Sequence, residues 1–541
     1  MANIRVRGHR FSDAPAMYMR RSKFDRSHVY KTTFNAGKLI PCFVDEVLPG
    51  DTGVLKVTDF ARLATPVVPF MDNLYLDWFF FFVPCRLVWE HWQNFCFEQE
   101  DPDDSTDYVI PTVTLPGNSE AGTAGIGTVW DYFGLPTGLT VTSPSVSALP
   151  FRAYYLIWNE WFRDENLQNS FKVDKSDKNV IMNPDASKKP EWITGDFEFQ
   201  LAPRGKRHDY FTSALPWQQK GPGVGLPLSG NAPISMPSAD TPFNELFPSV
   251  TNYPYRASAQ QSSTNNLTYT VATTGSEPAE WSFADLSAVS SATISDLRTA
   301  FQMQKFYERL ARGGSRYTEI LRSFFGVVSP DSRLQRPEYL GGYSKRININ
   351  PIAQTSSTND TTPQGNLAAY GVTASRFHGF SKSFVEHGYI IGMCEVRADL
   401  TYQQGINKMW LRSTVYDFYW PTFAHLSEQA ILMKEIYATG NPVEDDVVFG
   451  YQERYGEYRY KPSQITGKFR STYPQSLDVW HLSQKFENAP QLSAEFIQDN
   501  PPINRIKAVQ SEPDFLLDVE FNYKCIRPLP LFGTPGLVDH F

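Results

Sequence analysis

The N-terminal end of the chain carries side chains suited to binding a polyanion. The first 38 of the 541 residues contain nine Lys or Arg and only two Asp, so this arm has a net charge of +7 in a chain whose formal total is −8. Aromatic and His side chains are interleaved with the basic ones. Guanidinium groups bind phosphate with a planar fork of donors, and aromatic faces stack on unpaired bases. The candidate nucleic-acid-binding residues are Arg5, Arg7, Arg10, Arg20, Arg21, Lys23 and Arg26. A solvated basic tail without a partner is the alternative.

A dense acidic cluster between residues 98 and 107 has the oxygen ligands that Ca²⁺ requires. The cluster lacks the Gly and the terminal Glu of an EF-hand loop, which favours a solvated acidic loop over a metal site. Its members are Glu98, Glu100, Asp101, Asp103, Asp104 and Asp107. We therefore assign no metal ligand and no cofactor.

Sequence signatures of catalysis are missing. The chain has no phosphate loop of Walker spacing, no H-E-x-x-H, no G-x-S-x-G and no Cys/His cluster at zinc spacing. Its five cysteines are odd in number and form no C-x-x-C pair, which predicts reduced and mostly buried thiols. In glycoside hydrolases the fold brings two carboxylates together, so their separation along the sequence does not reveal such a pair. We predict that no residue is catalytic and that the protein is not an enzyme.

The composition favours a protein with a large buried or contacted surface. Aromatic residues make up 14% of the chain and charged residues 20%. Subunit interfaces are depleted of charge and enriched in Tyr, Trp and Arg, although a large, well-filled monomer has the same composition. No run reaches 18 apolar residues and no secretory signal is evident, so we expect neither membrane insertion nor export by the usual route.

Four segments have the pattern of β-strands. Residues 514–525 alternate between apolar and polar at nearly every position, which predicts a half-buried antiparallel strand. Residues 74–83 are aromatic or aliphatic at every position except Asp77, which predicts a strand covered on both faces. Residues 390–400 and 41–48 are predicted to form two further strands.

Helical patterns are fewer. An apolar stripe at helical spacing runs through residues 151–162. Residues 295–312 form a second predicted helix, with Ser295 as N-cap and Gly313 as stop. A third, short helix is predicted over residues 315–325.

The predicted connections are unusually long. Residues 106–150, 220–293 and 353–375 are rich in Ser, Thr, Gly, Pro and Asn. Strands separated by long excursions instead of regular helices favour a β-sandwich over an α/β fold. Loops of this length are functional or disordered in most compact domains.

Five segments, in order, resemble one family. They are His208–Trp217, Gly313–Leu321, Ser329–Gly342, Phe384–Gly392 and Tyr455–Ser463. The chain resembles the major capsid protein of the gokushoviruses, which are small tailless single-stranded-DNA phages of the microvirus group. The resemblance runs from about Ser27 to the C-terminus, and the segment after Gln219 departs from it.

The resemblance implies a mainly β fold: an eight-stranded antiparallel viral jelly roll, or β-sandwich, with long inter-strand insertion loops and a few short helices. It implies a subunit that self-assembles into a T=1 icosahedral shell around circular single-stranded DNA, located in the virion and assembled in the cytoplasm of a bacterial host. The expected partners are copies of the chain itself, the viral genome, minor virion proteins and a host surface receptor.

We expect the chain to divide into four segments. Residues 1–38 form a basic interior arm, and residues 39–219 form the first part of the jelly roll. Residues 220–294 form a variable surface protrusion used in host attachment, and residues 295–541 complete the jelly roll. Arg and aromatic residues between 313 and 342 are the expected subunit contacts: Arg316, Tyr317, Arg333 and Arg336.

Two alternatives from other classes remain. A carbohydrate-binding or carbohydrate-active β-sandwich would share the aromatic content and the long loops, but the basic arm and the lack of an export signal weigh against it. A phage attachment fibre would show internal repeats, and the sequence has none. A capsid subunit forms hollow isometric shells, whereas an enzyme forms monomers or small oligomers.

Overall fold

A computed structural model describes most of the chain and divides it into two compact units. One unit comprises Met1–Gln218 and Leu310–Phe541, and the other comprises Gln219–Arg309. The described residues are 20–114, 126–139, 144–181, 201–224, 234–235, 257–261, 267–271, 283–284, 294–313, 323–324, 335–355, 357–358 and 364–532. No helix among them is long and apolar enough to cross a membrane.

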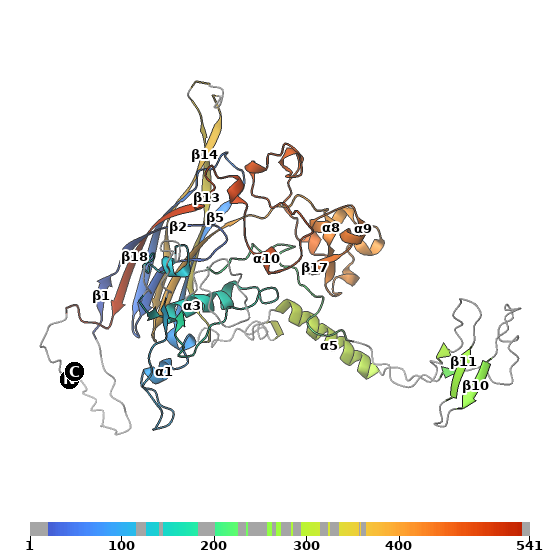
Figure 1. Cartoon of the computed structure of the whole chain (residues 1–541), viewed down its shortest axis with the longest axis horizontal. Helices are drawn as coiled ribbons and strands as arrows, with labels where there is room; N and C mark the ends of the chain where they lie inside the picture. Colours follow the sequence, from blue (N-terminus) through green and yellow to red (C-terminus); the bar gives the residue numbers. More distant parts are fainter. Residues whose placement is uncertain are drawn as a thin grey trace, which may run out of the picture. The chain divides into compact units, whose positions relative to one another are not determined.

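Eight strands form the frame of the larger unit (Figure 1). They are β2 (His28–Phe34), β3 (Ile40–Val47), β4 (Thr52–Leu63), β5 (Leu74–Pro84), β13 (Glu338–Ala353), β14 (Leu367–Ser383), β15 (Gly388–Ala398) and β18 (Phe515–Arg527). Every pairing between them is antiparallel. A short strand, β1 (Ser22–Asp25), pairs with the far end of β18.

The eight strands form two rows that one strand joins. The first row has the order β2–β18–β4–β14, and the second has the order β13–β5–β15–β3. Residues 338–347 of β13 pair with β5, whereas residues 348–353 pair with β14, so β13 joins the rows at one side. Along the chain, successive strands cross from one row to the other, except at the step from β5 to β13. This is the strand order of a jelly roll.

The two rows pack against each other as a sandwich. The ring of Phe43 on β3 lies 5.1 Å from that of Phe521 on β18, and the Trp78 ring on β5 lies 5.9 Å from that of Phe521. Trp78 Nε1 also donates a hydrogen bond of 2.7 Å across the core to Asp59 Oδ2 on β4. The predicted eight-stranded antiparallel β-sandwich is therefore confirmed.

The second row is covered on its other face as well. The helix α3 (Leu149–Ile157), which continues as one π-helical turn (η2, Trp158–Phe162), contributes to a second buried cluster with Phe81 and Val83 of β5. The Tyr154 hydroxyl donates a 2.7 Å hydrogen bond to the Leu39 carbonyl and fixes the helix on the sheet. Short elements complete this layer: α1 (Trp92–Phe95), β6 (Thr112–Thr114), α2 (Val129–Tyr132), β7 (Val146–Ser147) and β8 (Val180–Ile181). Both the helix predicted at 151–162 and the two-sided burial of residues 74–83 are confirmed.

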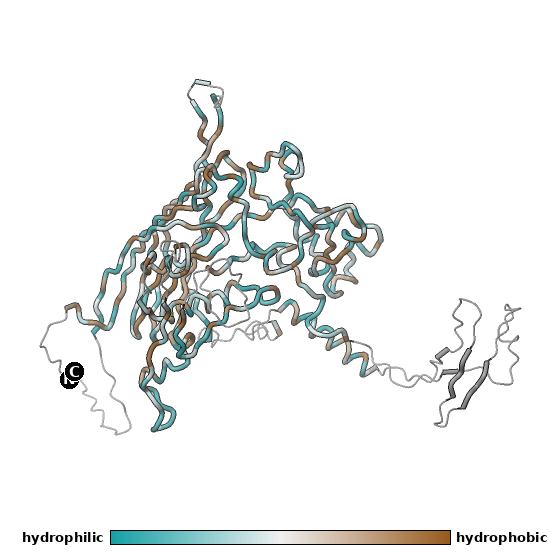
Figure 2. The backbone as a smooth tube through the Cα atoms, in the orientation of Figure 1, coloured by the Kyte–Doolittle hydropathy of each residue, from teal (hydrophilic) through white to brown (hydrophobic). Residues whose placement is uncertain are grey.

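The first row is buried on one face only. Along β18, Phe515, Leu517, Val519, Phe521 and Tyr523 are buried, while the residues between them are exposed or half-buried. The alternation along the strands of the sheet is visible in Figure 2 as a succession of hydrophilic and hydrophobic residues. The strand predicted over 514–525 is confirmed, and it has the predicted inner face.

A third buried cluster lies in the same unit, outside the sandwich. It contains Tyr210 and Phe211 together with Ile431 of β16 (Gln429–Leu432) and Phe449 of β17 (Val448–Gln452). Strands β16 and β17 pair antiparallel. Single helical turns accompany this pair: α8 (Met433–Ile436), α9 (Pro442–Asp445) and α10 (Ala494–Ile497).

The smaller unit contains two short antiparallel pairs and most of a helix. Strand β10 (Ala257–Gln261) pairs with β11 (Leu267–Val271), and β9 (Ile234–Ser235) pairs with β12 (Phe283–Ala284). Helix α5 runs from Ile294 to Gly313, which confirms the helix predicted at 295–312 and its stop. The predicted N-cap is wrong, because the helix begins one residue earlier and Ser295 is its second residue.

The prediction of a loop over residues 353–375 is wrong for its second half, because β14 begins at Leu367 and pairs with β4. Gly and Ser residues in this strand give it the composition of a loop. Most of the helix expected at 315–325 lies outside the described residues.

Candidate nucleic-acid interface

The exposed face of the first row is the best candidate for contact with a nucleic acid. On β4, the inward side chains enter the sandwich core, and Lys56, Thr58, Phe60 and Arg62 are exposed on the opposite face. Successive side chains of a strand point to opposite faces, so these four residues line one surface. Phe60 is an aromatic side chain in the middle of that surface, and 48% of it is exposed.

Strand pairing extends this surface across β14. His378 lies opposite Lys56, and Arg376 lies opposite Thr58, so these side chains emerge on the same face. Among the described residues, Lys56, Arg62 and Arg376 have no carboxylate within 4 Å. They form a group of unpaired cations beside an exposed ring, which is the combination that single-stranded nucleic acid binds.

The full face of the first row and β1 is net positive. Six basic residues lie on it: Lys23, Lys31, Lys56, Arg62, Arg376 and Lys524. Three acidic residues share it: Asp25, Asp518 and Glu520. Two of these carboxylates are already paired, Asp518 with Lys31 and Asp25 with Lys524. The hydrogen bond from Lys524 holds the pKa of Asp25 well below its usual range. Glu520 is therefore the remaining acidic group that faces the unpaired cations.

The predicted binding residues of the arm fall into two groups. Arg5, Arg7 and Arg10 lie outside the described residues. Arg20 and Lys23 are exposed, and Lys23 lies opposite Ile526 of β18. The basic arm is expected to end at residue 38, but β1 and β2 precede that residue and already belong to the sheet.

Two of the predicted arm residues are fixed by contacts within the chain. Arg26 Nη1 lies 2.6 Å from Asp45 Oδ2, and Arg21 Nη1 donates a 2.9 Å hydrogen bond to the Gly50 carbonyl. Burial raises the pKa of Asp45, while Arg26 and Arg527 oppose that shift. Arg26 therefore neutralises a buried carboxylate, a role that its sequence position does not reveal.

The expected subunit contacts are only partly described. Arg316, Tyr317 and Arg333 lie outside the described residues. The guanidinium of Arg336 lies 4.4 Å from the ring centre of Trp161, so this residue stacks on an aromatic side chain of its own chain.

The acidic cluster at 98–107 forms a turn. The Asp104 carboxylate accepts hydrogen bonds from the backbone N–H groups of Glu100 and Asp101, at 3.0 and 2.9 Å. Within the described part of the chain, no group of three or more His, Cys, Asp or Glu residues is arranged to hold a metal ion. All five cysteines are free thiols, four of them buried and Cys96 exposed.

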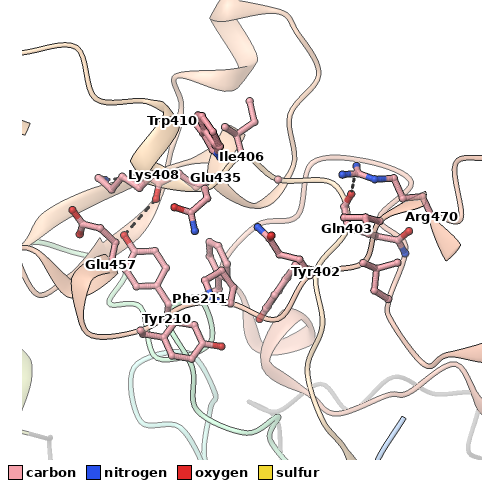
Figure 3. Close-up of a pocket in the computed structure, with 17 residues that line it drawn as sticks. Tyr210, Phe211, Tyr402, Gln403, Ile406, Lys408, Trp410, Glu435, Glu457 and Arg470 are labelled. Carbon is pink, nitrogen blue, oxygen red and sulfur yellow. Dashed lines mark hydrogen bonds and ion pairs between the residues drawn. The ribbon is translucent and has the colours of Figure 1, made fainter. Parts of the chain in front are cut away.

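A cavity of about 270 Å³ lies beside the third buried cluster (Figure 3). Aromatic side chains such as Tyr210 and Tyr402 line it together with charged ones. Its charged groups are engaged with neighbours: Lys408 Nζ lies 3.0 Å from Glu435 Oε1, and Arg470 Nη1 donates a 2.8 Å hydrogen bond to the Gln403 carbonyl. This pairing points to a structural role for these charges.

Comparison with known proteins decides the family. The family model described as "Capsid protein (F protein)" matches residues 12–537. The chain belongs to this family of phage capsid proteins. It is 47% identical over 546 residues to capsid protein VP1 of Bdellovibrio phage phiMH2K, with 98% of each chain covered. It is 44% identical over 590 residues to capsid protein VP1 of Chlamydia phage 1, again over 98% of each chain, and 36% identical over 566 residues to capsid protein VP1 of Spiroplasma virus 4, over 99% of each.

These matches confirm the resemblance to the gokushovirus major capsid proteins of the microvirus group. This capsid protein is a structural component of the virion, and copies of it assemble into the shell. The two alternatives, a carbohydrate-specific β-sandwich and an attachment fibre, lose their support.

The unpaired cations of β4 and β14 are not among the residues predicted from the sequence. Lys56 and Arg62 lie on a strand that ends at Leu63, whereas Arg376 lies on a strand that begins at Leu367. Only the register between these two strands brings the three side chains onto one surface. The one available signal is the alternation of basic and apolar residues within β4 itself.

Proposed function

We propose that this capsid protein holds a single-stranded DNA genome against the exposed face of its first row of strands. The support is the set of unpaired cations Lys56, Arg62 and Arg376 around Phe60. Residues 1–38 add further positive charge to the same task, and Lys23 emerges on the same face. Each contact is weak, but many copies in one shell act together.

Replacing the three unpaired cations tests this proposal. The variant Lys56→Gln, Arg62→Gln, Arg376→Gln should assemble but package less DNA per particle. Its subunits should bind single-stranded DNA with a shallower salt dependence, the slope of log affinity against log salt falling by about 0.7 for each phosphate that is no longer neutralised. Lys31→Gln is the matched control, because Lys31 lies on the same face but is already paired with Asp518. Unchanged DNA content and salt slope in the triple variant would refute the proposal.

The basic arm needs a separate test. The variant with Gln in place of Arg5, Arg7, Arg10 and Arg20 removes arm charge while leaving the Arg21 and Arg26 contacts intact. We expect a further reduction of packaged DNA. If shells fail to form while unassembled subunits remain folded, the arm instead clamps neighbouring subunits.

We also propose that the 220–294 segment contacts the host surface, with a receptor as its partner. It falls within the separate compact unit Gln219–Arg309, and residues 257–296 contain no Lys or Arg, which suits a solvated and variable surface. Deleting residues 225–293 should leave shells intact and abolish adsorption to host cells. Failure of shells to form would make the segment an assembly element. Binding to minor virion proteins is a further expectation, to be tested by cross-linking in purified virions.

A further inference from the structure

Large apolar side chains are exposed on the segment of the chain that connects β15 to β16. Six of them define what we call the aromatic surface: Trp410, Val415, Tyr416, Phe418, Tyr419 and Trp420. Trp410 is 74% exposed and Val415 is 65% exposed. Single exposed apolar residues are normal on a monomer, whereas six within eleven consecutive positions concentrate exposed apolar area on one segment, as is typical of a binding surface.

The aromatic surface has a defined conformation. It is built on three 3₁₀ turns, η4 (Lys408–Trp410), η5 (Val415–Asp417) and η6 (Pro421–Phe423). The Asp417 carboxylate accepts hydrogen bonds from the backbone N–H groups of Ser413 and Thr414, and Trp420 Nε1 donates a 3.0 Å hydrogen bond to the Val415 carbonyl. A partner would therefore meet rings that are already positioned, with little ordering left to be done on binding.

The charged side chains of this segment have partners within the chain. Lys408 pairs with the buried carboxylate of Glu435, and Arg412 Nη2 lies 3.3 Å from Glu457 Oε1 while its guanidinium stacks on Tyr458. Asp417 is occupied by the turn that it caps. Within the described segment 408–423, therefore, each cation already has a partner in the chain. A nucleic acid is a poor match, since single strands are bound where cations accompany the rings.

We infer that the aromatic surface is a contact between copies of this capsid protein, in which the surface of one copy packs against the same surface of another. Copies of this chain assemble into the shell, so each copy has other copies as neighbours. Contacts about a two-fold axis are the commonest between identical chains, and there a surface must face itself. An aromatic surface whose ions are already paired meets its own copy without repulsion. Its composition of Trp, Tyr, Phe and paired Arg is also that of an interface core.

Opposite charges placed at one position test this inference. Val415 has an apolar and exposed side chain, so Val415→Asp and Val415→Lys each place like charges face to face if the surface packs on itself. Each variant alone should reduce the yield of shells at least about tenfold, because like charges brought together in an interface are costly. Co-expression of the two variants should restore most of the yield. Shells are quantified by sedimentation and negative-stain microscopy.

The exposure-matched control is Val443→Asp, at a valine that is 81% exposed and lies outside the aromatic surface. It should assemble like the wild type. Rescue in the mixed sample also shows that both Val415 variants fold. The inference is overturned if Val415→Asp assembles normally, or if the mixture of the two variants fails to assemble. It is also overturned if shells form normally and only host adsorption or DNA content falls, since the surface would then bind the host or the genome.

Discussion

The two rows of the sandwich differ in how many of their faces are buried. Strand β5, in the second row, buries Trp78 and Phe80 against the first row and Phe81 and Val83 against the α3 layer. Strand β18, in the first row, buries every second residue and leaves the others exposed or half-buried. The difference shows that one sheet of this capsid protein is buried on both faces, whereas the other has one exposed face among the described residues.

The rows also differ in whether their ion pairs are buried or exposed to solvent. In the second row, Glu395 is fully buried, with Arg204 Nε 2.7 Å and Arg397 Nε 3.1 Å from its Oε1. Burial raises the pKa of Glu395, and the two arginines oppose that shift. On the exposed face of the first row, Lys31 and Asp518 pair in contact with solvent. Equal substitutions in the two rows should therefore have very unequal effects.

The largest effect is expected at Trp78. Trp78→Ala removes a fully buried indole and the donor to Asp59, whose pKa burial already raises. We expect the free energy of unfolding to fall by about 4 kcal/mol. Phe60→Ala, on the exposed face, should change it by less than about 1 kcal/mol. Urea unfolding of unassembled subunits measures both, and equal decreases would contradict the two-sided burial of the second row.

The next effect concerns the buried ion pair. Arg204→Met leaves Glu395 with a single arginine partner in the core and should cost about 3 kcal/mol. Arg376→Met on the exposed face should cost almost nothing, because Arg376 has no carboxylate within reach among the described residues. The same unfolding measurement applies. A small decrease for Arg204→Met would mean that Arg397 alone compensates the charge.

A third effect depends on pH. Burial raises the pKa of Asp499 to about 7, Glu395 adds to the shift, and Arg397 and Lys206 oppose it. Because an Asp in the unfolded chain has a pKa of about 3.9, the folded state binds this proton more tightly. The contribution of Asp499 to stability is therefore present at low pH and is lost as the pH rises from about 4 to about 7.

Asp499→Asn should remove this dependence. Relative to the wild type, its stability should increase between about pH 5 and about pH 7, by up to about 2 kcal/mol. The matched control is Asp518→Asn, the same substitution at a carboxylate on the exposed face. Thermal unfolding at a series of pH values gives both curves. Parallel curves for wild type and Asp499→Asn would show that Asp499 is ionised in the folded protein throughout.

The smallest effect is expected at the exposed pair of the first row. Lys31→Met should cost less than about 1 kcal/mol, and the cost should shrink further at high salt. Unfolding at low and high salt checks this. A large, salt-independent decrease would mean that Lys31 is not solvated as the structure shows.

Much of the fold could be predicted from the sequence, but the strand β4 could not. Its inner face includes Asp59, and its outer face includes Phe60, so polar and apolar residues are reversed at the centre of the strand. Asp59 is tolerated inside because Trp78 Nε1 and Ser375 donate hydrogen bonds to it from two other strands. No pattern within residues 52–63 carries that information.

The candidate interface was only partly predictable, for the same reason. The net charge of residues 1–38 identifies a basic segment, but it does not show that Arg26 pairs with Asp45. Lys56 and Arg376 are far apart in the sequence and become neighbours through the register of β4 and β14. Counting charges along the sequence finds basic clusters that lie within one segment. Pairing between strands creates further clusters, whose basic residues come from different segments of the chain.

Strand β18 follows all the other strands of the sandwich in the chain, yet it lies inside the first row, between β2 and β4. During translation, the ribosome therefore releases β2 and β4 long before the strand that must separate them. A nascent chain holds an incomplete sheet until residue 527 has emerged. A product truncated before β18 would lack the strand that lies between β2 and β4, so it could not complete the first row.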